Sequence, residues 1–426
     1  MEFNKAQSTI MLMDINSCFA TIEQQANPLL RGKPIVVAAF VTGKGAILAA
    51  SVEAKRLGIK TGMRVMDAKN IYPRVVVLPP DPWKYRNVHL LLKNIIASYT
   101  NDFAPKSIDE FVLNLKDFLN ASPCPCKASP CRHKMLHIAL EIKKRIKEEV
   151  GDWITVSIGI APNRYLAKIG AGITKPDGLN EINFDNFLDV YSKLKLTDLT
   201  GIKEANARRL NSVGIYTVLD FYNAPIWKIK AVFHSITGYY WHIRLSGYEV
   251  DDVEYERRSF GNSVAIGKNL YKVSELSPIL ARLTEKMCSR LRASGYTAGG
   301  IHLGLAYKGG GYWHEGHSLG RQCFDSKDFY KAAVRLLIKA NSRSPVLNVA
   351  VSCFGLSRET SLQLEFFEDV GKKENLTNAI DDVNKRWGEF TVSSARSLGG
   401  AKVVMDRIAF GQGGIKELAT PPSPLL

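Results

Sequence analysis

Short apolar runs alternate with helical patterns along the first 180 or so residues. The run at residues 10–13, IMLM, ends on Asp14, as a buried strand does when it presents a side chain at its end. Further segments with strand-like patterns lie at residues 34–37, 75–78, 103–115 and 154–160. Helical patterns lie at residues 90–99, 134–150 and 164–172. This alternation predicts an α+β sheet unit that contains a small α/β insertion between residues 20 and 79.

The remaining chain changes character twice. From residue 184 to residue 247 the pattern is helical, and LTGIK (199–203) and VGIY (213–216) are turn signals spaced as in a helix-hairpin-helix repeat, which predicts a separate small helical domain. Residues 248–258 are highly charged and indicate a linker. A second α+β domain is expected at residues 259–411, and a disordered tail at 412–426. The helices of this second α+β domain are predicted at 274–294 and 326–340, and its strands at 299–306 and 347–354.

Length and composition narrow the class of protein. A chain of 426 residues is expected to form several domains. We find no apolar run of about 18 residues that could span a membrane and no secretory signal, and the seven scattered cysteines do not resemble a disulfide framework. We therefore expect a soluble protein in a reducing, bacterial-type cytoplasm.

The charge points to a partner. A net charge of +16 favours a polyanion, with nucleic acid as the first candidate, although a basic protein without such a partner is the alternative.

Three carboxylates form the most informative set of polar residues. Asp14 ends the first predicted strand, and Asp109 with Glu110 lies on another, without histidine or cysteine at a suitable spacing. Oxygen ligands of this kind suit Mg²⁺, and two such ions can activate a hydroxyl and neutralise a triphosphate. Acids at strand ends can also be solvated caps. That alternative is weaker for all three together.

The sequence around these acids resembles the Y-family (translesion) DNA polymerases. MDINSCFATIEQ is similar to their first catalytic motif and SIDEF to their second. The resemblance continues through GAILAASVEAKRLGIKTGM, VSIGIAPNRYLAKIGAGITKPDG, the GIK and VGI turns and VNKRWG, covers about residues 10–411, and looks closest to bacterial DNA polymerase IV-like enzymes.

The resemblance implies a multidomain α/β and α+β fold shaped like a right hand. The expected parts are a ferredoxin-like palm (1–17 and 80–182), small fingers (18–79), a helical thumb (183–247), a linker (248–258) and an α+β little finger (259–411). It also implies template-directed, low-fidelity synthesis from dNTP onto a primer 3′-OH. A non-catalytic DNA-binding accessory factor on the same fold is the competing hypothesis, although it would have little need of three intact acids.

The site residues are carried over by position. Asp14, Asp109, Glu110 and the main-chain carbonyl of Ile15 would bind two Mg²⁺ ions. Residues that the resemblance assigns to the nucleotide are Ser17, Cys18 and Phe19, followed by Lys55 and Lys175. The amides of residues 17–19 would hold phosphates, and Phe19 would be the steric gate that excludes a 2′-hydroxyl. Taken alone, Phe19 could be a core residue and Lys175 a solvated lysine.

The chain departs from the family in its fingers. Val52 and Lys55 occupy positions where many members have a tyrosine and an arginine that clamp the triphosphate, and Ala49 stands where a hydroxyl residue is common. The nucleotide is then held more loosely, or Arg56 substitutes; the sequence leaves both open. Small residues at 38–51 would form a roomy roof over the nascent base pair.

Contacts to DNA are expected in three places. Gly201 and Gly214 in the two turns would present backbone amides to phosphates, and Arg257 and Arg258 would begin a basic surface that continues through residues 268–292. Plain helical turns and solvated charges are the alternatives. We expect a monomer bound to primer-template DNA.

Two motifs lie outside this scheme. Gln363, Leu364, Phe366 and Phe367 in QLEFF resemble the peptide by which bacterial polymerases bind the sliding clamp, although the phenylalanines could pack in their own domain. The cluster Cys124, Cys126, Cys131 and His133 lacks the paired CxxC spacing of structural zinc sites, so a surface loop is favoured over zinc.

Overall fold

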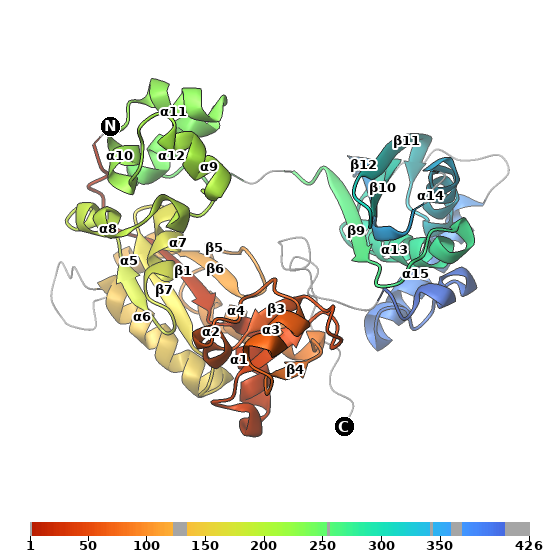
Figure 1. Cartoon of the computed structure of the whole chain (residues 1–426), viewed down its shortest axis with the longest axis horizontal. Helices are drawn as coiled ribbons and strands as arrows, with labels where there is room; N and C mark the ends of the chain where they lie inside the picture. Colours follow the sequence, from red (N-terminus) through yellow and green to blue (C-terminus); the bar gives the residue numbers. More distant parts are fainter. Residues whose placement is uncertain (1, 122–133, 254–255, 341–343, 359–368, 405–426) are drawn as a thin grey trace. The chain divides into compact units, whose positions relative to one another are not determined.

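The protein divides into two compact units, the first built on residues 1–254 and the second on residues 255–408 (Figure 1). The structure is a computed structural model and describes residues 2–121, 134–253, 256–340, 344–358 and 369–404. The boundary between the units falls inside the segment 248–258 that the sequence indicates as a linker.

A five-stranded sheet lies at the centre of the first unit. Its strand order is β5-β6-β1-β7-β8, and β1 (Ile10–Ile15) pairs antiparallel with both β6 (Glu110–Asn114) and β7 (Val156–Ala161). Strand β8 (Leu179–Glu181) pairs parallel with β7. Helix α7 packs on β1 and β7, whose apolar runs are almost entirely buried. The helices of this region are α4 (Pro82–Ala97), α5 (Lys116–Ala121), α6 (Lys134–Arg145) and α7 (Arg164–Ile173).

The expectation of one strand over residues 103–115 is wrong. The segment folds back on itself as β5 (Phe103–Pro105) and β6, with Phe103 opposite Leu113. The amide of Lys106 donates to the carbonyl oxygen of Glu110 at 2.8 Å and closes the turn. Pro105 lacks an N–H and favours the end of a strand. Asp109 therefore lies in a turn, directly before the strand that begins with Glu110.

A small α/β insertion follows β1, as the sequence predicts. Its sheet has the order β3-β2-β4 and its own core of small and branched residues. The strands are β2 (Ile35–Ala38), β3 (Ile47–Ala50) and β4 (Val76–Leu78). The helices are α1 (Cys18–Ala26), α2 (Val52–Arg56) and α3 (Val65–Ile71). Ser51 caps α2 by accepting from the amide of Ala54, which fixes where the helix begins.

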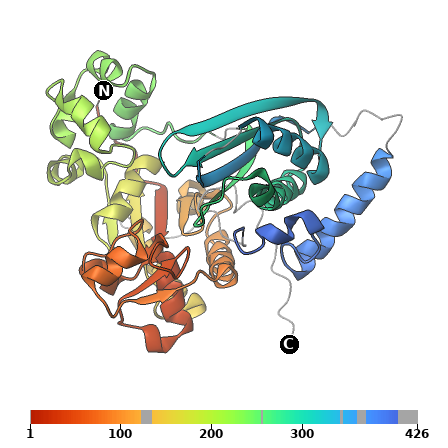
Figure 2. The ribbon, with the colours of Figure 1, turned by 45° about the vertical axis from the view of Figure 1, so that its right-hand side comes forward.

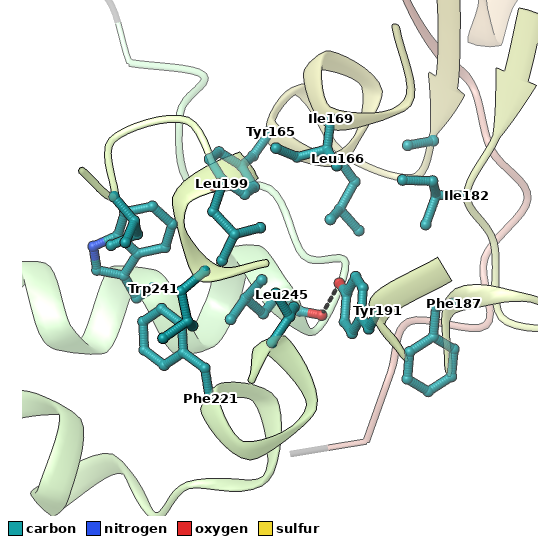
Figure 3. Packing of buried hydrophobic residues seen from close by; sticks show 14 of the residues in the cluster. Tyr165, Leu166, Ile169, Ile182, Phe187, Tyr191, Leu199, Phe221, Trp241 and Leu245 are labelled. Atoms are coloured by element: carbon teal, nitrogen blue, oxygen red, sulfur yellow. Dashed lines mark hydrogen bonds between the residues drawn. The ribbon is translucent and has the colours of Figure 1, made fainter. Parts of the chain in front are cut away.

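The helical region shares its core with the central sheet. Its helices are α8 (Phe187–Lys193), α9 (Glu204–Asn211), α10 (Val218–Asn223), α11 (Ile226–Phe233) and α12 (Thr237–Leu245). Figure 3 shows residues of α7 such as Tyr165 and Leu166 in one cluster with Trp241 and Leu245 of α12. The hydroxyl of Tyr191 donates to the carbonyl oxygen of Leu245 at 2.7 Å. The sequence predicts a separate helical domain, whereas the buried cluster is continuous across it.

The second unit has a four-stranded antiparallel sheet of order β11-β10-β12-β9. Helices α13 (Val273–Ala293) and α14 (Ser326–Ala340) form its core with the sheet and confirm the two predicted helices. Strands β10 (Thr297–Tyr307) and β12 (Val346–Ser357) contain the two predicted strands. Elements of this unit that the sequence does not predict include β9 (Ser259–Ala265), β11 (Tyr312–Cys323) and α15 (Val370–Trp387).

Candidate active site

Strand pairing brings the three predicted carboxylates to one end of the central sheet. Asp14 of β1 lies opposite Glu110 of β6 in the antiparallel register. The amide of Ile15 donates to the carbonyl oxygen of Asp109 at 2.9 Å, which fixes that residue at the end of β1. Residues directly opposite in such a pair project to the same side. The fold therefore places Asp14 and Glu110 as neighbours, with Asp109 next in the chain.

Two lysines neutralise this group of carboxylates. The Nζ of Lys175 lies 2.8 Å from Asp14, and the Nζ of Lys168 lies 2.7 and 2.9 Å from the two oxygens of Glu110. The hydroxyl of Ser107 donates to Asp109. Burial raises the pKa of the Asp14 carboxyl above its usual value; Lys175 opposes this rise, and the charges of Asp109 and Glu110 add to it. The carboxylates thus lie near enough to repel one another, and cations offset the repulsion.

A cavity of about 530 Å³ opens beside these residues. It contains most of the residues that the sequence assigns to metal and nucleotide. These lining residues are Asp14, Ile15, Ser17, Cys18, Phe19, Lys55, Asp109 and Lys175. Glu110 is not among the lining residues of this cavity; its carboxylate pairs with Lys168. The lining also includes three residues that the sequence does not assign to the site: Asn16, Thr61 and Pro176. Two further lining residues are Arg56 and Ala49.

Three cations, Lys55, Arg56 and Lys175, are among the lining residues of the cavity, and we call them the cationic wall. The Nζ of Lys55 donates to the hydroxyl of Ser17 at 2.8 Å, which joins α2 to the start of α1. Burial lowers the pKa of the Lys55 ammonium and the charge of Lys175 lowers it further, while Asp14 and Asp109 act in the opposite sense. Arg56, next to Lys55, also lines the cavity. The wall can therefore receive a strongly anionic group.

Phe19 forms a rigid part of the lining. Its side chain is only 2% exposed, and its ring stacks on Tyr85 of α4 with centroids 4.2 Å apart. The hydroxyl of Tyr85 donates to Glu23 at 2.8 Å, and Lys84 pairs with the same carboxylate. The stack leaves Phe19 little freedom to move away from a group in the cavity.

Asn16 forms hydrogen bonds with two other segments at the cavity. The sequence does not indicate this role. The side-chain amide of Asn16 donates to Ser157 at 2.9 Å, and its side-chain oxygen accepts from the amide of Asp177 at 2.8 Å. The second bond holds the loop that carries Lys175. Neither Asn16 nor Lys168 gives a signal in one sequence, because each acts through a partner distant in the chain.

Comparison with known proteins identifies the family. The impB/mucB/samB family matches residues 13–172, and its C-terminal domain matches residues 257–366. DNA polymerase IV of Pelotomaculum thermopropionicum is 31% identical over 404 residues, which span 93% of this chain and 97% of that protein. DNA polymerase IV 1 of Bacillus subtilis is 27% identical over 398 residues, 91% of this chain and 93% of the relative. The chain belongs to the Y family of DNA polymerases.

The fold agrees with this assignment. A Y-family DNA polymerase chimera of Dbh and Dpo4 superposes with a TM-score of 0.71 at 24% identity, covering 82% of this chain and 99% of the chimera. The DNA polymerase IV relatives show that the protein is a DNA-directed DNA polymerase. Its fold is that of a polymerase with palm, fingers, thumb and little finger. Divalent metal dependence follows for the family in general. Within the described residues, no helix of the polymerase is long and apolar enough to cross a membrane.

The predicted DNA contacts of the polymerase lie on both units. Gly201 and Gly214 have φ values of +98° and +75°, which favour glycine and explain the turn signals. The amide of Gly214 already donates to the carbonyl oxygen of Asn211 at 3.0 Å. Arg258 is exposed at the start of the second unit, and the guanidinium of Arg257 lies 4.4 Å from the ring centroid of Phe260.

Two predicted sites of the polymerase fall outside the described residues. These are the clamp-binding residues Gln363, Leu364, Phe366 and Phe367, and the cluster Cys124, Cys126, Cys131 and His133. Among the residues that are described, no group of three or more His, Cys, Asp and Glu side chains is close enough to hold a metal ion.

Proposed function

We propose that the polymerase carries out translesion synthesis at low fidelity, transferring a nucleotide from dNTP to a primer 3′-OH with two Mg²⁺ ions. One observation carries this proposal: Asp14 and Asp109 share one cavity with the cationic wall of Lys55, Arg56 and Lys175. Acids suited to divalent cations and cations suited to a triphosphate thus face the same space.

The oxygen donors are of the type that magnesium prefers, although the three carboxylates would have to move closer together to share an ion, since the described side chains contain no group of three close enough to hold one. The carboxylates of Asp14, Asp109 and Glu110 and the carbonyl oxygen of Ile15 are hard oxygen ligands at the end of the sheet, and the burial of Asp14 favours any added positive charge. Two Mg²⁺ ions bound there would supply Lewis acidity and charge neutralisation. Lys175 and Lys168, which pair with two of these acids, would hold the site electrostatically balanced before a cation arrives.

The cationic wall would hold the nucleotide triphosphate. The amides of Ser17, Cys18 and Phe19 lie at the beginning of α1, the positive end of the helix dipole, which favours an anionic group. Lys175 and Lys55 add charge from two other segments. Arg56 lines the same cavity. Its position supports the alternative that Arg56 holds the triphosphate in place of the family's arginine, which this chain lacks at Lys55.

Low fidelity would follow from the small side chains above the cavity. Leu48, Ala49 and Ala50 of β3 line it, and the two alanines end at Cβ. A roof of this size contacts a base pair weakly, so it penalises a misshapen pair less than a tightly packed roof would. The ring of Phe19, held by Tyr85, would instead provide steric selection at the sugar.

Primer-template DNA would be held by sequence-independent contacts. Gly201 supports a phosphate contact at the thumb; Gly214 is the weaker candidate, because its amide is already engaged. Arg257 and Arg258 would approach the backbone from the little finger. We further propose a monomer in a bacterial-type cytoplasm that docks on a sliding clamp through Gln363, Leu364, Phe366 and Phe367.

Primer extension tests the proposal directly. Wild type should extend a primed template with dNTP and Mg²⁺, whereas Asp109→Ala should not. Asp117→Ala, an exposed acid on α5, is the matched control and should extend normally. If neither wild type nor Asp109→Ala extends a primer although both bind primed DNA, the chain is an accessory factor and the proposed chemistry is wrong.

A further inference from the structure

Residues 174–178, TKPDG, connect the end of α7 to β8 and carry Lys175. We call them the Lys175 loop. Residues 174–176 are exposed to solvent, and the side chain of Lys175 is 42% exposed. A lysine ammonium sits on a flexible four-carbon stem, so its position depends strongly on the backbone that carries it. The Nζ of Lys175 nevertheless lies 2.8 Å from Asp14, so the path of this exposed loop must be fixed from inside the protein.

Two buried polar side chains contact the Lys175 loop. Ser157 of β7 lies directly opposite Asp14 of β1, and the two strands, red and yellow, run side by side in Figure 2. Asn16 follows the end of β1. Ser157 is 0% exposed and Asn16 is 4% exposed. Polar groups at this depth are stable only when they are hydrogen-bonded, so their partners show what each side chain holds in place.

Ser157 holds both ends of the Lys175 loop. Its hydroxyl donates to the carbonyl oxygen of Thr174 and accepts from the amide of Gly178, each at 3.2 Å. The amide of Ile158, next in β7, donates to the carbonyl oxygen of Gly178 at 3.0 Å. The ends of the loop are so close that a Cβ at Gly178 would lie 2.0 Å from the carbonyl oxygen of Thr174. The loop is therefore a tight turn that needs glycine at its end and rests on one hydroxyl.

Asn16 holds the middle of the Lys175 loop. Its Oδ1 accepts from the amide of Asp177 at 2.8 Å, and its Nδ2 donates to the hydroxyl of Ser157 at 2.9 Å. Asp177 has a φ of +58°, which is uncommon for a residue with a side chain, so the bond to its amide stabilises an unfavourable conformation. The backbone of Asn16 is itself fixed, because its N–H donates to Thr155 and its carbonyl oxygen accepts from Thr21.

We propose that Asn16 and Ser157 are positioning residues that set Lys175 for the triphosphate of the incoming nucleotide. The inference rests on the proposed contact of Lys175 with the triphosphate and adds the residues that place it. Ser157 is not among the lining residues of the cavity, and the side-chain oxygen and nitrogen of Asn16 are both engaged by the protein. The pair therefore acts through the Lys175 loop. Without it Lys175 keeps its charge, but the charge is spread over many positions and binds the triphosphate less well.

Single-nucleotide insertion by the full chain, with dCTP and Mg²⁺ on a primed template, tests this. A hydrogen bond of ordinary strength changes an equilibrium by about twofold to tenfold. For Asn16→Ala we therefore expect the KM for dCTP to rise about threefold to tenfold. Lys175→Met removes the charge that Asn16 positions. In a Lys175→Met background, Asn16→Ala should leave KM unchanged, because residues that act through one contact are not additive.

Two comparisons separate positioning from stability. Ser157→Ala should raise KM as Asn16→Ala does, whereas Ser157→Thr keeps the hydroxyl and should restore KM to near the wild-type value. Asn186→Ala is the matched control. Asn186 also donates one bond, to Glu181 at 2.8 Å, and accepts one, from the amide of Asn183 at 2.9 Å, and it is not among the lining residues of the cavity. It should lower the thermal unfolding temperature and leave KM unchanged.

Three results would overturn the proposal. A folded Asn16→Ala variant with the wild-type KM shows that the loop does not need this side chain. An equal rise in KM with and without Lys175 shows that Asn16 acts by another route. If Ser157→Thr is as impaired as Ser157→Ala at equal stability, the hydroxyl is not the holding group; this pair also decides the question if Asn16→Ala does not fold. A wild type that inserts no nucleotide gives no KM at all, and in that case the proposed synthesis itself fails.

Discussion

Removing the ring of Phe19 should relax the choice between ribonucleotides and deoxynucleotides. The ring is held against Tyr85 at 4.2 Å and has 2% exposure, so it cannot yield to a 2′-hydroxyl without disturbing the core. A single steric contact of this kind discriminates by about 10- to 200-fold. For Phe19→Ala we expect the ratio of kcat/KM for dNTP over rNTP to fall by about two orders of magnitude. The same change should cost about 3–5 kcal/mol of stability, because a buried aromatic ring is lost.

Variants of Tyr85 separate the gate from general damage. Tyr85→Phe keeps the stacked ring and loses only the hydrogen bond to Glu23, so sugar discrimination should stay near wild type. Tyr85→Ala removes the support behind Phe19 and should give an intermediate loss. Single-nucleotide insertion with dCTP and CTP measures the ratio, and thermal unfolding measures stability. A folded Phe19→Ala variant with an unchanged ratio would refute the assignment of Phe19 as the gate.

The remaining predictions concern the cationic wall and the peptide proposed to bind the sliding clamp. Val52→Tyr with Lys55→Arg restores a hydroxyl and a bidentate fork and should lower the KM for dNTP; an unchanged KM would show that Arg56 already holds the phosphates. Because burial lowers the pKa of Lys55, its charge is lost as the pH rises at a lower value than for an ordinary lysine. The KM for dNTP should therefore rise with pH, and Lys55→Arg should move that rise to higher pH; identical profiles would exclude Lys55 from the contact. Changing Gln363, Phe366 and Phe367 to alanine should abolish clamp-stimulated synthesis and spare distributive synthesis. Stimulation that survives the triple change, or a collapse of basal activity, would contradict the docking peptide.

The sequence predicts where Asp14 lies in the fold, whereas it does not predict the residues that surround it. Asp14 is readable because an apolar run ends on it, and its position at the end of β1 follows from that run. The sequence gives no signal for Lys168, Asn16 and Tyr85, because each contacts a residue far away in the chain. A polar side chain gives no periodic signal when a single distant partner decides its role.

The errors in the fold also have physical reasons. Strand β11, YWHEGHSLGRQC, is an edge strand with few apolar positions, so it lacks the alternation by which half-buried strands are recognised. In residues 103–115 the β propensity is high on both sides of the turn, which conceals the reversal at Lys106. The sequence also does not predict that thumb and palm share one core. The spacing of apolar residues shows that a helix has an apolar face, but it does not show which other element packs on that face.

Helix α7 links the turn that contains Gly201 to the carboxylate of Glu110. The hydroxyl of Tyr165, in its first turn, donates to the carbonyl oxygen of Thr200, next to the turn glycine Gly201. One turn later, Lys168 of the same helix binds both oxygens of Glu110. A helix rises about 1.5 Å per residue and resists bending over so short a span. The spacing between the turn at Gly201 and the carboxylate of Glu110 is therefore set by a short, stiff stretch of helix. If the proposed contacts hold, a primer backbone bound at Gly201 lies at a fixed distance from Glu110.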